Sequence, residues 1–154
     1  MTGKLIVHAA DDADAFEDGA DRGRILVHGR DTDGAYSLME LVVAPAPAGQ
    51  TSHGAHLHAG CDETFLVRSG ELEFLLGDEV VTLRTGDFVR APAGVRHGYA
   101  NVSGAPVELI VGFHPAGLEA LFVKYRTDRE GPAEGDGFKA DAERLFGSVF
   151  DLDG

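Results

Sequence analysis

The sequence predicts an all-β domain, a sandwich or barrel, followed by one or two helices. Apolar runs of about four to eight residues are separated by glycine- or proline-containing corners roughly every ten residues. Further along the chain, apolar residues recur with a helical period. At 154 residues the chain is long enough to bury the core of one domain. We therefore expect a β-domain over residues 1–115 and a helical extension over residues 116–154.

The N-terminal third of the chain contains three candidate strands. Residues 4–8 alternate weakly and predict an edge strand, whereas the acidic residues 11–24 predict a loop or a short helical turn. Residues 25–28 are a short apolar run, and an Asp-Gly pair after them marks a turn. The run at residues 36–43 is rich in residues that favour strands and is the clearest strand of this region.

The middle of the chain alternates between short strands and tight turns. Proline cannot donate a hydrogen bond to a β-ladder, so Pro45 and Pro47 end the preceding strand. A Gly-Asp pair between two apolar runs predicts a hairpin over residues 71–84. The further strands that we expect cover residues 53–58, 64–68, 88–91, 99–102 and 107–113.

The residues after the β-region predict two helices. The first is expected over residues 117–125, because four apolar residues there fall on one helical face. Residues 128–137 are polar and glycine-rich and predict a loop. A second amphipathic helix is expected over residues 138–150. Its apolar side would consist of Ala142, Leu145, Phe146, Val149 and Phe150.

The composition is that of an ordinary globular protein and argues against some classes of partner. The chain has 26 acidic and 13 basic residues, a formal charge of −13, which repels nucleic acid and anionic membranes. No apolar run is long enough to predict a membrane span, and the N-terminus lacks the apolar core of a signal peptide. The single cysteine, Cys61, rules out an internal disulfide and fits a reducing compartment. We expect a cytoplasmic protein.

A histidine pair in the middle of the chain is the first indication of a metal site. His56 and His58 are two residues apart, so on a strand their side chains share one face. Glu63 has the opposite parity, but a bend or bulge at residues 59–62 can bring it to the same face. His97 must arrive from a distant strand, which requires a closed or folded-over sheet. Such ligands suit Fe, Mn, Co, Ni, Cu or Zn, although an isolated histidine pair is more often structural or exposed.

The spacing of these residues resembles the two sequence motifs of the cupin family. The first motif, over residues 49–70, has its opening glycine one place early and is matched by His56, His58, Glu63 and Gly70. The second motif, over residues 86–101, is matched by Gly86, Pro92, Gly94, His97 and Asn101. The resemblance implies a double-stranded β-helix (jelly-roll) barrel. It also implies that the three histidines and Glu63 hold one divalent transition metal, Fe first and Mn, Ni, Cu, Co or Zn as alternatives.

The resemblance also carries an expectation about the reaction. Residues 113–122 resemble the same region of small single-domain cupins grouped with quercetin dioxygenase. They imply a metal-dependent dioxygenase for a small aromatic or enolisable molecule, with Glu63 as ligand, catalytic base or both. One alternative is an isomerase, cyclase or lyase that uses the metal as a Lewis acid while Glu63 or Tyr99 moves protons. A second alternative is a metal-binding module without turnover.

Strand parity indicates which residues line the substrate pocket, because side chains two residues apart share a face. Residues that share parity with the ligands, and one face of the strand at residues 36–43, should point inwards. The residues expected to line the pocket are Met39, Leu41, Phe65, Val67 and Tyr99. Small barrels of this kind often pair, and the predicted edge strand at residues 4–8 offers a surface for pairing. We therefore also expect a homodimer.

Overall fold

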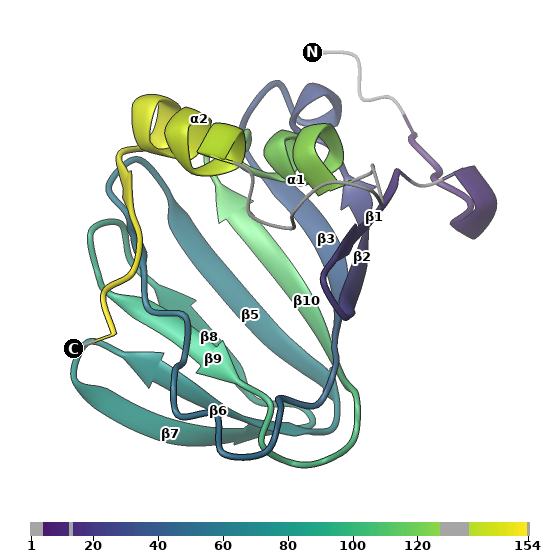
Figure 1. Cartoon of the computed structure of the whole chain (residues 1–154). Coiled ribbons are helices and arrows are strands. Elements are labelled where there is room, and N and C mark those ends of the chain that lie inside the picture. The colour runs from purple at the N-terminus through teal and green to yellow at the C-terminus, as the bar shows by residue number, and fades with distance from the viewer. Residues whose placement is uncertain (1–4, 13, 127–135, 154) are drawn as a thin grey trace.

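Two β-sheets pack against each other, and two helices lie at one end of them (Figure 1). The structure is a computed structural model that describes residues 5–12, 14–126 and 136–153. The larger sheet consists, in spatial order, of β1 (Ala15–Asp18), β2 (Asp21–Val27), β3 (Ser37–Val43), β10 (Val107–His114), β5 (Asp62–Ser69) and β8 (Phe88–Ala91). The smaller sheet consists of β7 (Glu79–Arg84), β6 (Glu71–Leu76) and β9 (His97–Ala100). Every pairing in the two sheets is antiparallel.

A third, two-stranded sheet joins the barrel to the C-terminal part of the chain. In it β4 (Leu57–His58) pairs antiparallel with β11 (Ser148–Val149). The helices α1 (Glu119–Arg126) and α2 (Asp136–Phe146) contact each other, and Figure 1 shows both over the same end of the sheets. Short 3-10 helices are η1 (Ala10–Asp12) and η2 (Gly29–Asp31). Within the described ranges, no helix is long and apolar enough to cross a membrane.

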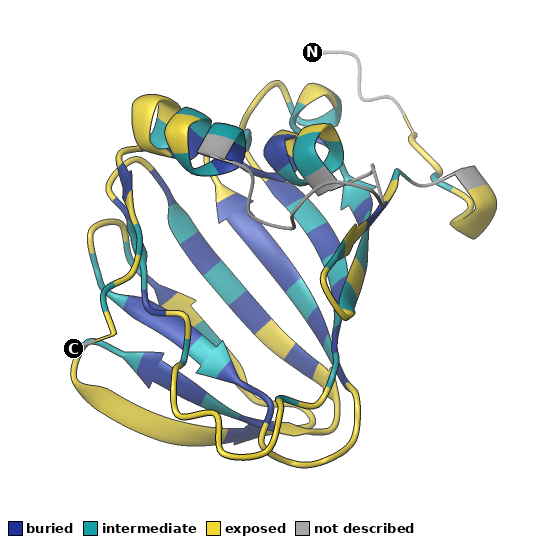
Figure 2. Cartoon of the chain, viewed as in Figure 1, coloured by how far each residue is buried: buried dark blue, intermediate teal, exposed yellow. Residues whose placement is uncertain are grey.

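The hydrophobic core lies between the two sheets, because alternate residues of the strands point inwards. Every second residue of β3 from Ser37 to Val43 is buried, and Figure 2 shows the same alternation of colours along β5. Phe65 of β5 packs edge-to-face on Phe74 of β6, with ring centroids 4.9 Å apart. This contact joins the two sheets, and the architecture confirms the predicted all-β barrel followed by C-terminal helices.

Most of the predicted strands are present, with shifted ends. The expected strand at residues 36–43 is β3, and the expected hairpin at residues 71–84 is β6 and β7. The strand predicted at residues 99–102 begins two residues earlier, as β9. At residues 53–58 only the last two residues form a strand, and His56 adds a single bridge to His97.

The predicted N-terminal edge strand is wrong for its described part. Residues 5–8 form no strand, and Lys4 lies outside the described residues. Leu5 and Val7 are 87% and 78% exposed, so these apolar side chains are not buried against the barrel and contribute little hydrophobic stabilisation.

The acidic stretch at residues 11–24 also differs from the prediction of a loop or helical turn. Most of it belongs to the hairpin of β1 and β2, preceded by η1. Phe16 of β1 is buried and lies over Gly23 of β2, where a Cβ atom would collide with the aromatic ring. Gly23 therefore makes room for the one large apolar side chain of β1 rather than breaking the strand.

The second predicted helix ends earlier than expected. It was expected over residues 138–150, but α2 ends at Phe146 and Gly147 follows with φ of 58°. Glycine adopts this left-handed conformation readily and commonly ends helices. The chain then turns into β11, so Val149 and Phe150 do not lie on a helical face. The loop expected at residues 128–137 lies largely outside the described residues.

Candidate metal centre

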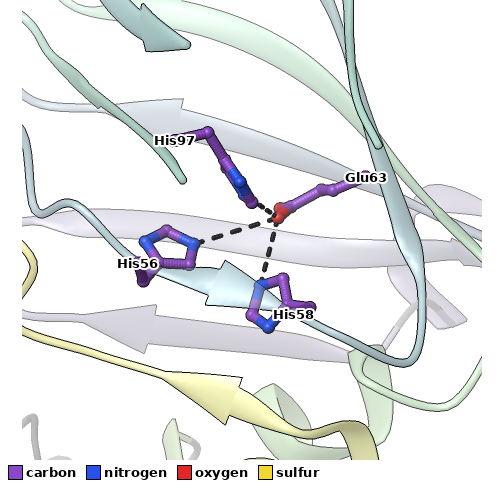
Figure 3. Close-up of side chains that lie close together, drawn as sticks. All are labelled: His56, His58, Glu63 and His97. Atoms are coloured by element: carbon purple, nitrogen blue, oxygen red, sulfur yellow. Dashed lines mark hydrogen bonds and ion pairs between the residues drawn. The ribbon is translucent and has the colours of Figure 1, made fainter. Parts of the chain in front are cut away.

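Four side chains from separate parts of the chain meet inside the barrel (Figure 3). His58 lies on β4, Glu63 at the start of β5 and His97 at the start of β9. His56 precedes β4 and is fixed to His97 by two backbone hydrogen bonds of 2.9 and 2.8 Å. One potential ligand atom from each residue lies within 4.8 Å of all the others. The fold thus brings together the three histidines and the glutamate that the motifs indicate.

One oxygen of Glu63 is the common contact of the three imidazoles. Its Oε2 atom lies 2.8 Å from Nε2 of His97, 3.3 Å from Nε2 of His58 and 3.9 Å from Nε2 of His56. Glu63, His58 and His97 are buried, and His56 is half-buried. The four groups therefore form a largely dehydrated cluster in which all three Nε2 atoms face one point.

The Nδ1 atoms on the opposite side of the rings are already engaged. Nδ1 of His56 donates to the carbonyl oxygen of Gly54 at 2.7 Å, and Nδ1 of His97 donates to that of Val95 at 2.9 Å. A carbonyl oxygen can only accept, so both Nδ1 atoms carry hydrogen. This arrangement leaves Nε2 available for a metal, as is usual for histidine ligands in proteins.

The electrostatics of the cluster favour a bound cation. Burial acts to raise the pKa of Glu63, but its interactions with the imidazoles of His56, His58 and His97 hold that pKa well below its usual value. Burial acts to lower the pKa of His97, but its hydrogen bond with Glu63 raises the pKa above the ordinary 6.5. A carboxylate and imidazole lone pairs repel at such distances unless protons or a metal ion lie between them. The donor set of three nitrogens and one oxygen fits one divalent transition metal.

The chain bends between the histidine pair and Glu63. The backbone N–H of Gly60 donates to the carbonyl oxygen of Phe146 at 2.8 Å, and a Cβ atom on Gly60 would lie only 3.1 Å from that oxygen. Glycine therefore permits a close contact with the end of α2. Burial and the negative charges of Glu63 and Asp62 raise the pKa of the neighbouring Cys61 to about 12. Its thiol is accordingly unreactive and is not part of the cluster.

Gly98 is a second glycine that shapes the site, and the sequence analysis did not single it out. It follows His97 directly, and a Cβ atom there would collide with the carbonyl oxygen of His53. The absence of a side chain lets the segment before His56 lie against β9. This close approach places His56 beside His97, where the rings are 4.5 Å apart between centroids.

A cavity of about 210 Å³ borders the cluster. Of the five residues predicted to line a pocket, four lie on its wall: Met39, Leu41, Phe65 and Tyr99. Val67 does not line it, although its side chain is buried in the core of the barrel. The helical extension and the segment after it close the cavity with Leu118, Phe122, Phe138, Lys139 and Phe150. A separate depression of about 300 Å³ over β1, β2 and β3 contains no residue of the cluster.

Tyr99 is half-buried on the cavity wall and retains its proton at neutral pH. Burial, and then the nearby carboxylates of Asp21, Glu63 and Asp18, raise its pKa well above the ordinary value of 10.0. Its neutral hydroxyl group is therefore able to donate a hydrogen bond to a molecule in the cavity.

Two arginines within the second motif do not line the cavity. Arg90 forms an ion pair with Asp62, and Nε of Arg96 donates to the carbonyl oxygen of Leu152 at 2.8 Å. Arg90 is exposed and Arg96 is half-buried. Neither provides a cationic contact for a molecule beside the cluster.

Two residues that follow α2 contact the histidines, and the sequence did not indicate either contact. The Oγ atom of Ser148 lies 2.6 Å from Nδ1 of His58, and both residues are buried. The ring of Phe150 stacks on His56, with centroids 6.0 Å apart and an angle of 24° between the planes. The local sequence gives no signal for these contacts, because they depend on the pairing of β11 with β4.

The fold and the cluster define a small double-stranded β-helix protein with a candidate metal centre. Residues 43–113 match the family model described as a cupin domain. This match over residues 43–113 confirms the resemblance carried by the two motifs. No curated protein matches the sequence.

Several solved structures share the fold at low sequence identity. KdgF from Halomonas sp. has a TM-score of 0.63 and 19% identity, with 76% of this chain and 99% of that chain covered. The nucleoside dehydratase Pac13 from Streptomyces has a TM-score of 0.60 and 16% identity, with 76% and 88% covered. A predicted oxalate decarboxylase from Thermotoga maritima has a TM-score of 0.56 and 19% identity, with 62% and 80% covered. At these identities the comparisons show a common fold.

Proposed function

We propose that the protein is a metal-dependent enzyme that acts on a small organic molecule. The observation that carries this proposal is the convergence of three imidazole Nε2 atoms and one carboxylate oxygen beside a small cavity. A cavity of about 210 Å³ suits a small ligand rather than a polymer. The names of the structural neighbours include enzymes, which favours catalysis over simple binding.

The residues of the site have distinct tasks in this proposal. His56, His58, His97 and Glu63 would hold one divalent transition metal, which supplies a Lewis-acidic or redox-active centre when bound. The anionic state of Glu63 compensates the positive charge of the ion. Tyr99 keeps its proton and donates a hydrogen bond to an oxygen of the substrate. The apolar walls formed by the helices keep water from the reacting atoms.

The reaction that we propose first is a dioxygenation, with Fe as the metal. Phe65, Phe138 and Phe150 give the cavity aromatic walls, which suit a flat aromatic or enolisable substrate. A carbon acid of this kind becomes electron-rich once it loses a proton, and its enolate can then react with O₂. Glu63 is the candidate base for that proton, although its low pKa favours the role of a ligand.

Isomerase, cyclase or lyase chemistry is the second candidate. Its specific support is Tyr99, a neutral hydroxyl group on the wall of the cavity, since a hydrogen bond from it stabilises negative charge that develops on a substrate oxygen during elimination or ring closure. The names of two structural neighbours, a nucleoside dehydratase and a predicted oxalate decarboxylase, point in the same direction. In this case the metal acts as a Lewis acid without a change of oxidation state.

Turnover with and without oxygen distinguishes the two reactions. Protein loaded with Fe²⁺ should consume O₂ when given flavonols or β-diketones, and should not convert them under anaerobic conditions. An oxygen electrode and mass spectrometry of the products measure both quantities. Conversion that proceeds equally well without O₂ contradicts the dioxygenase proposal and supports the second candidate. A molecule that binds but is recovered unchanged in air would indicate a binding module.

The homodimer and the cytoplasmic location stay predictions. The edge strand at residues 5–8, which was the stated surface for pairing, does not form. Among the described residues, β7 and β8 each pair with a single strand at the end of a sheet and offer edges for pairing. Light scattering on the purified protein measures the mass directly, and we expect twice that of the 16.3 kDa chain. A monomeric mass contradicts the dimer.

A further inference from the structure

The contact between Ser148 and His58 differs from the two other contacts that hold the histidine rings. His56 and His97 are oriented by backbone carbonyl oxygens of residues two positions away in the chain. His58 is oriented by a side-chain hydroxyl group from a segment 90 residues further along, at 2.6 Å. Ser148 is 0% exposed, so water cannot replace the hydroxyl group without rearrangement.

The segment that carries Ser148 is anchored to the strand that carries the histidines. We call residues 147–153 the C-terminal segment. Its strand β11 pairs with β4, placing Ser148 opposite His58; it is the yellow strand beside His58 in Figure 3. The N–H of Ala59 donates to the carbonyl oxygen of Gly147 at 3.2 Å, and the N–H of Leu152 donates to that of Ala55 at 2.9 Å. Backbone hydrogen bonds thus hold the segment on both sides of the histidine pair.

Side chains strengthen the attachment at the end of the C-terminal segment. The carboxylate of Asp153 accepts hydrogen bonds from Ser52 at 2.5 Å and from the N–H groups of His53 and Ala55, both at 3.2 Å. Arg96, next to the ligand His97, donates to the carbonyl oxygen of Leu152. The position of the Ser148 hydroxyl group is therefore determined by a network and not by one flexible contact.

A metal at Nε2 of His58 requires the ring hydrogen to reside on Nδ1. The Ser148 oxygen is the acceptor placed to receive that hydrogen. We propose that Ser148 is a positioning residue of the metal centre, which fixes the orientation and tautomer of His58 through the C-terminal segment. The segment lies outside residues 43–113, the part of the chain that matches the family model. This inference rests on the metal site of the proposed function.

Substitution of Ser148 tests the proposal without removal of a ligand. Ser148→Ala should weaken Zn²⁺ binding by about 10- to 100-fold, the range found when outer partners of ligating histidines are removed. Competition with a chromophoric chelator measures the affinity. The matched control is Ser37→Ala, because Ser37 is equally buried and its hydroxyl group donates to Glu119 at 2.8 Å, away from the metal site. Ser37→Ala should leave the affinity unchanged.

Nuclear magnetic resonance of ¹⁵N-labelled histidine measures the tautomer and hydrogen exchange of each ring separately. A general loss of stability would not change these for His58 alone. In the Zn²⁺-loaded protein the Nδ1 hydrogen of His58 should exchange slowly with solvent. Ser148→Ala should speed its exchange while the signals of His56 and His97 keep their tautomer. If Ser148→Ala does not fold, Ser148→Cys retains a weaker partner of similar size and should bind Zn²⁺ with reduced affinity.

The outcomes separate this inference from the proposed function. Equal affinity of the wild type and both Ser148 variants overturns the role of Ser148, as does an equal loss in Ser37→Ala. If Ser148→Ala binds Zn²⁺ more weakly and the wild type shows no turnover, the role of Ser148 is supported and the proposed enzymatic function is contradicted. A wild type that binds none of the six candidate ions overturns both.

Discussion

Replacing His97 with alanine should abolish stoichiometric metal binding. The substitution removes one of three nitrogen ligands and leaves the carboxylate of Glu63 without its 2.8 Å contact. The ring of His97 is 1% exposed and packs near Phe65 and Phe74, so water fills the vacated position poorly. We expect a loss of affinity beyond the roughly 100-fold that follows removal of an outer partner of a ligand.

Metal content by mass spectrometry, on protein purified without added chelator, measures the effect. The matched control is His53→Ala. The backbone of His53 lies against β9, the strand of His97, but its ring contacts Glu73 at 3.1 Å and is not part of the cluster. The control should retain the metal of the wild type. Near-stoichiometric metal in His97→Ala would contradict the proposed site, and loss of metal in both variants would indicate that any change in this region disturbs it.

The strands of the barrel were predictable where one face is buried and the other is not. At residues 36–43 the apolar run predicts a strand, but Leu38 and Val42 are apolar too, so the run alone did not decide which face points inwards. The structure buries the face of Met39 and Leu41. The turns at Gly70 and Gly86 have φ of 99° and 93°, which glycine alone adopts readily. Local chemistry therefore determines both the strands and the corners between them.

The hairpin of β1 and β2 could not be predicted from its own residues. Phe16 is the one large apolar residue of β1, and acidic residues and glycines surround it. Within the hairpin the ring of Phe16 lies over Gly23, and outside it the ring lies 5.1 Å from that of Phe122 on α1. The contact with Phe122 is long-range, and no local period encodes it.

The candidate metal site also has a part that was predictable from the sequence and a part that was not. The ligands were predictable because spacing along two motifs identifies them, and the spacing encodes which strands deliver them. The contacts of Ser148 and Phe150 with the histidines were not predictable. The apolar residues around them continue the helical period of α2, so the sequence predicts a helix past the point where α2 ends. Gly147 ends that helix. The residues after it form a strand because they pair with β4. Residues supplied by a segment outside the two motifs are thus the part of the site that the sequence did not indicate.

Replacing Phe65 with alanine should destabilise the protein more than any single substitution on its surface. Phe65 is 2% exposed, packs on Phe74 across the two sheets and also lines the cavity beside the metal site. Loss of a buried phenylalanine ring removes its transfer free energy and leaves a void that the barrel closes only in part. We expect the free energy of unfolding to fall by about 3–5 kcal/mol. Urea unfolding in the presence of a chelator measures this without a contribution from bound metal.

Phe88→Ala is the matched control, because Phe88 lies on the neighbouring strand β8 but is 63% exposed. Its replacement should cost less than about 1 kcal/mol, since little apolar area leaves a dry environment. Similar losses in the two variants would contradict the assignment of Phe65 to the contact that joins the sheets. If the free energy of unfolding falls strongly in Phe65→Ala alone, the same side chain both lines the cavity and stabilises the core of the barrel. Substitutions there that reshape the site for another substrate would then also lower stability.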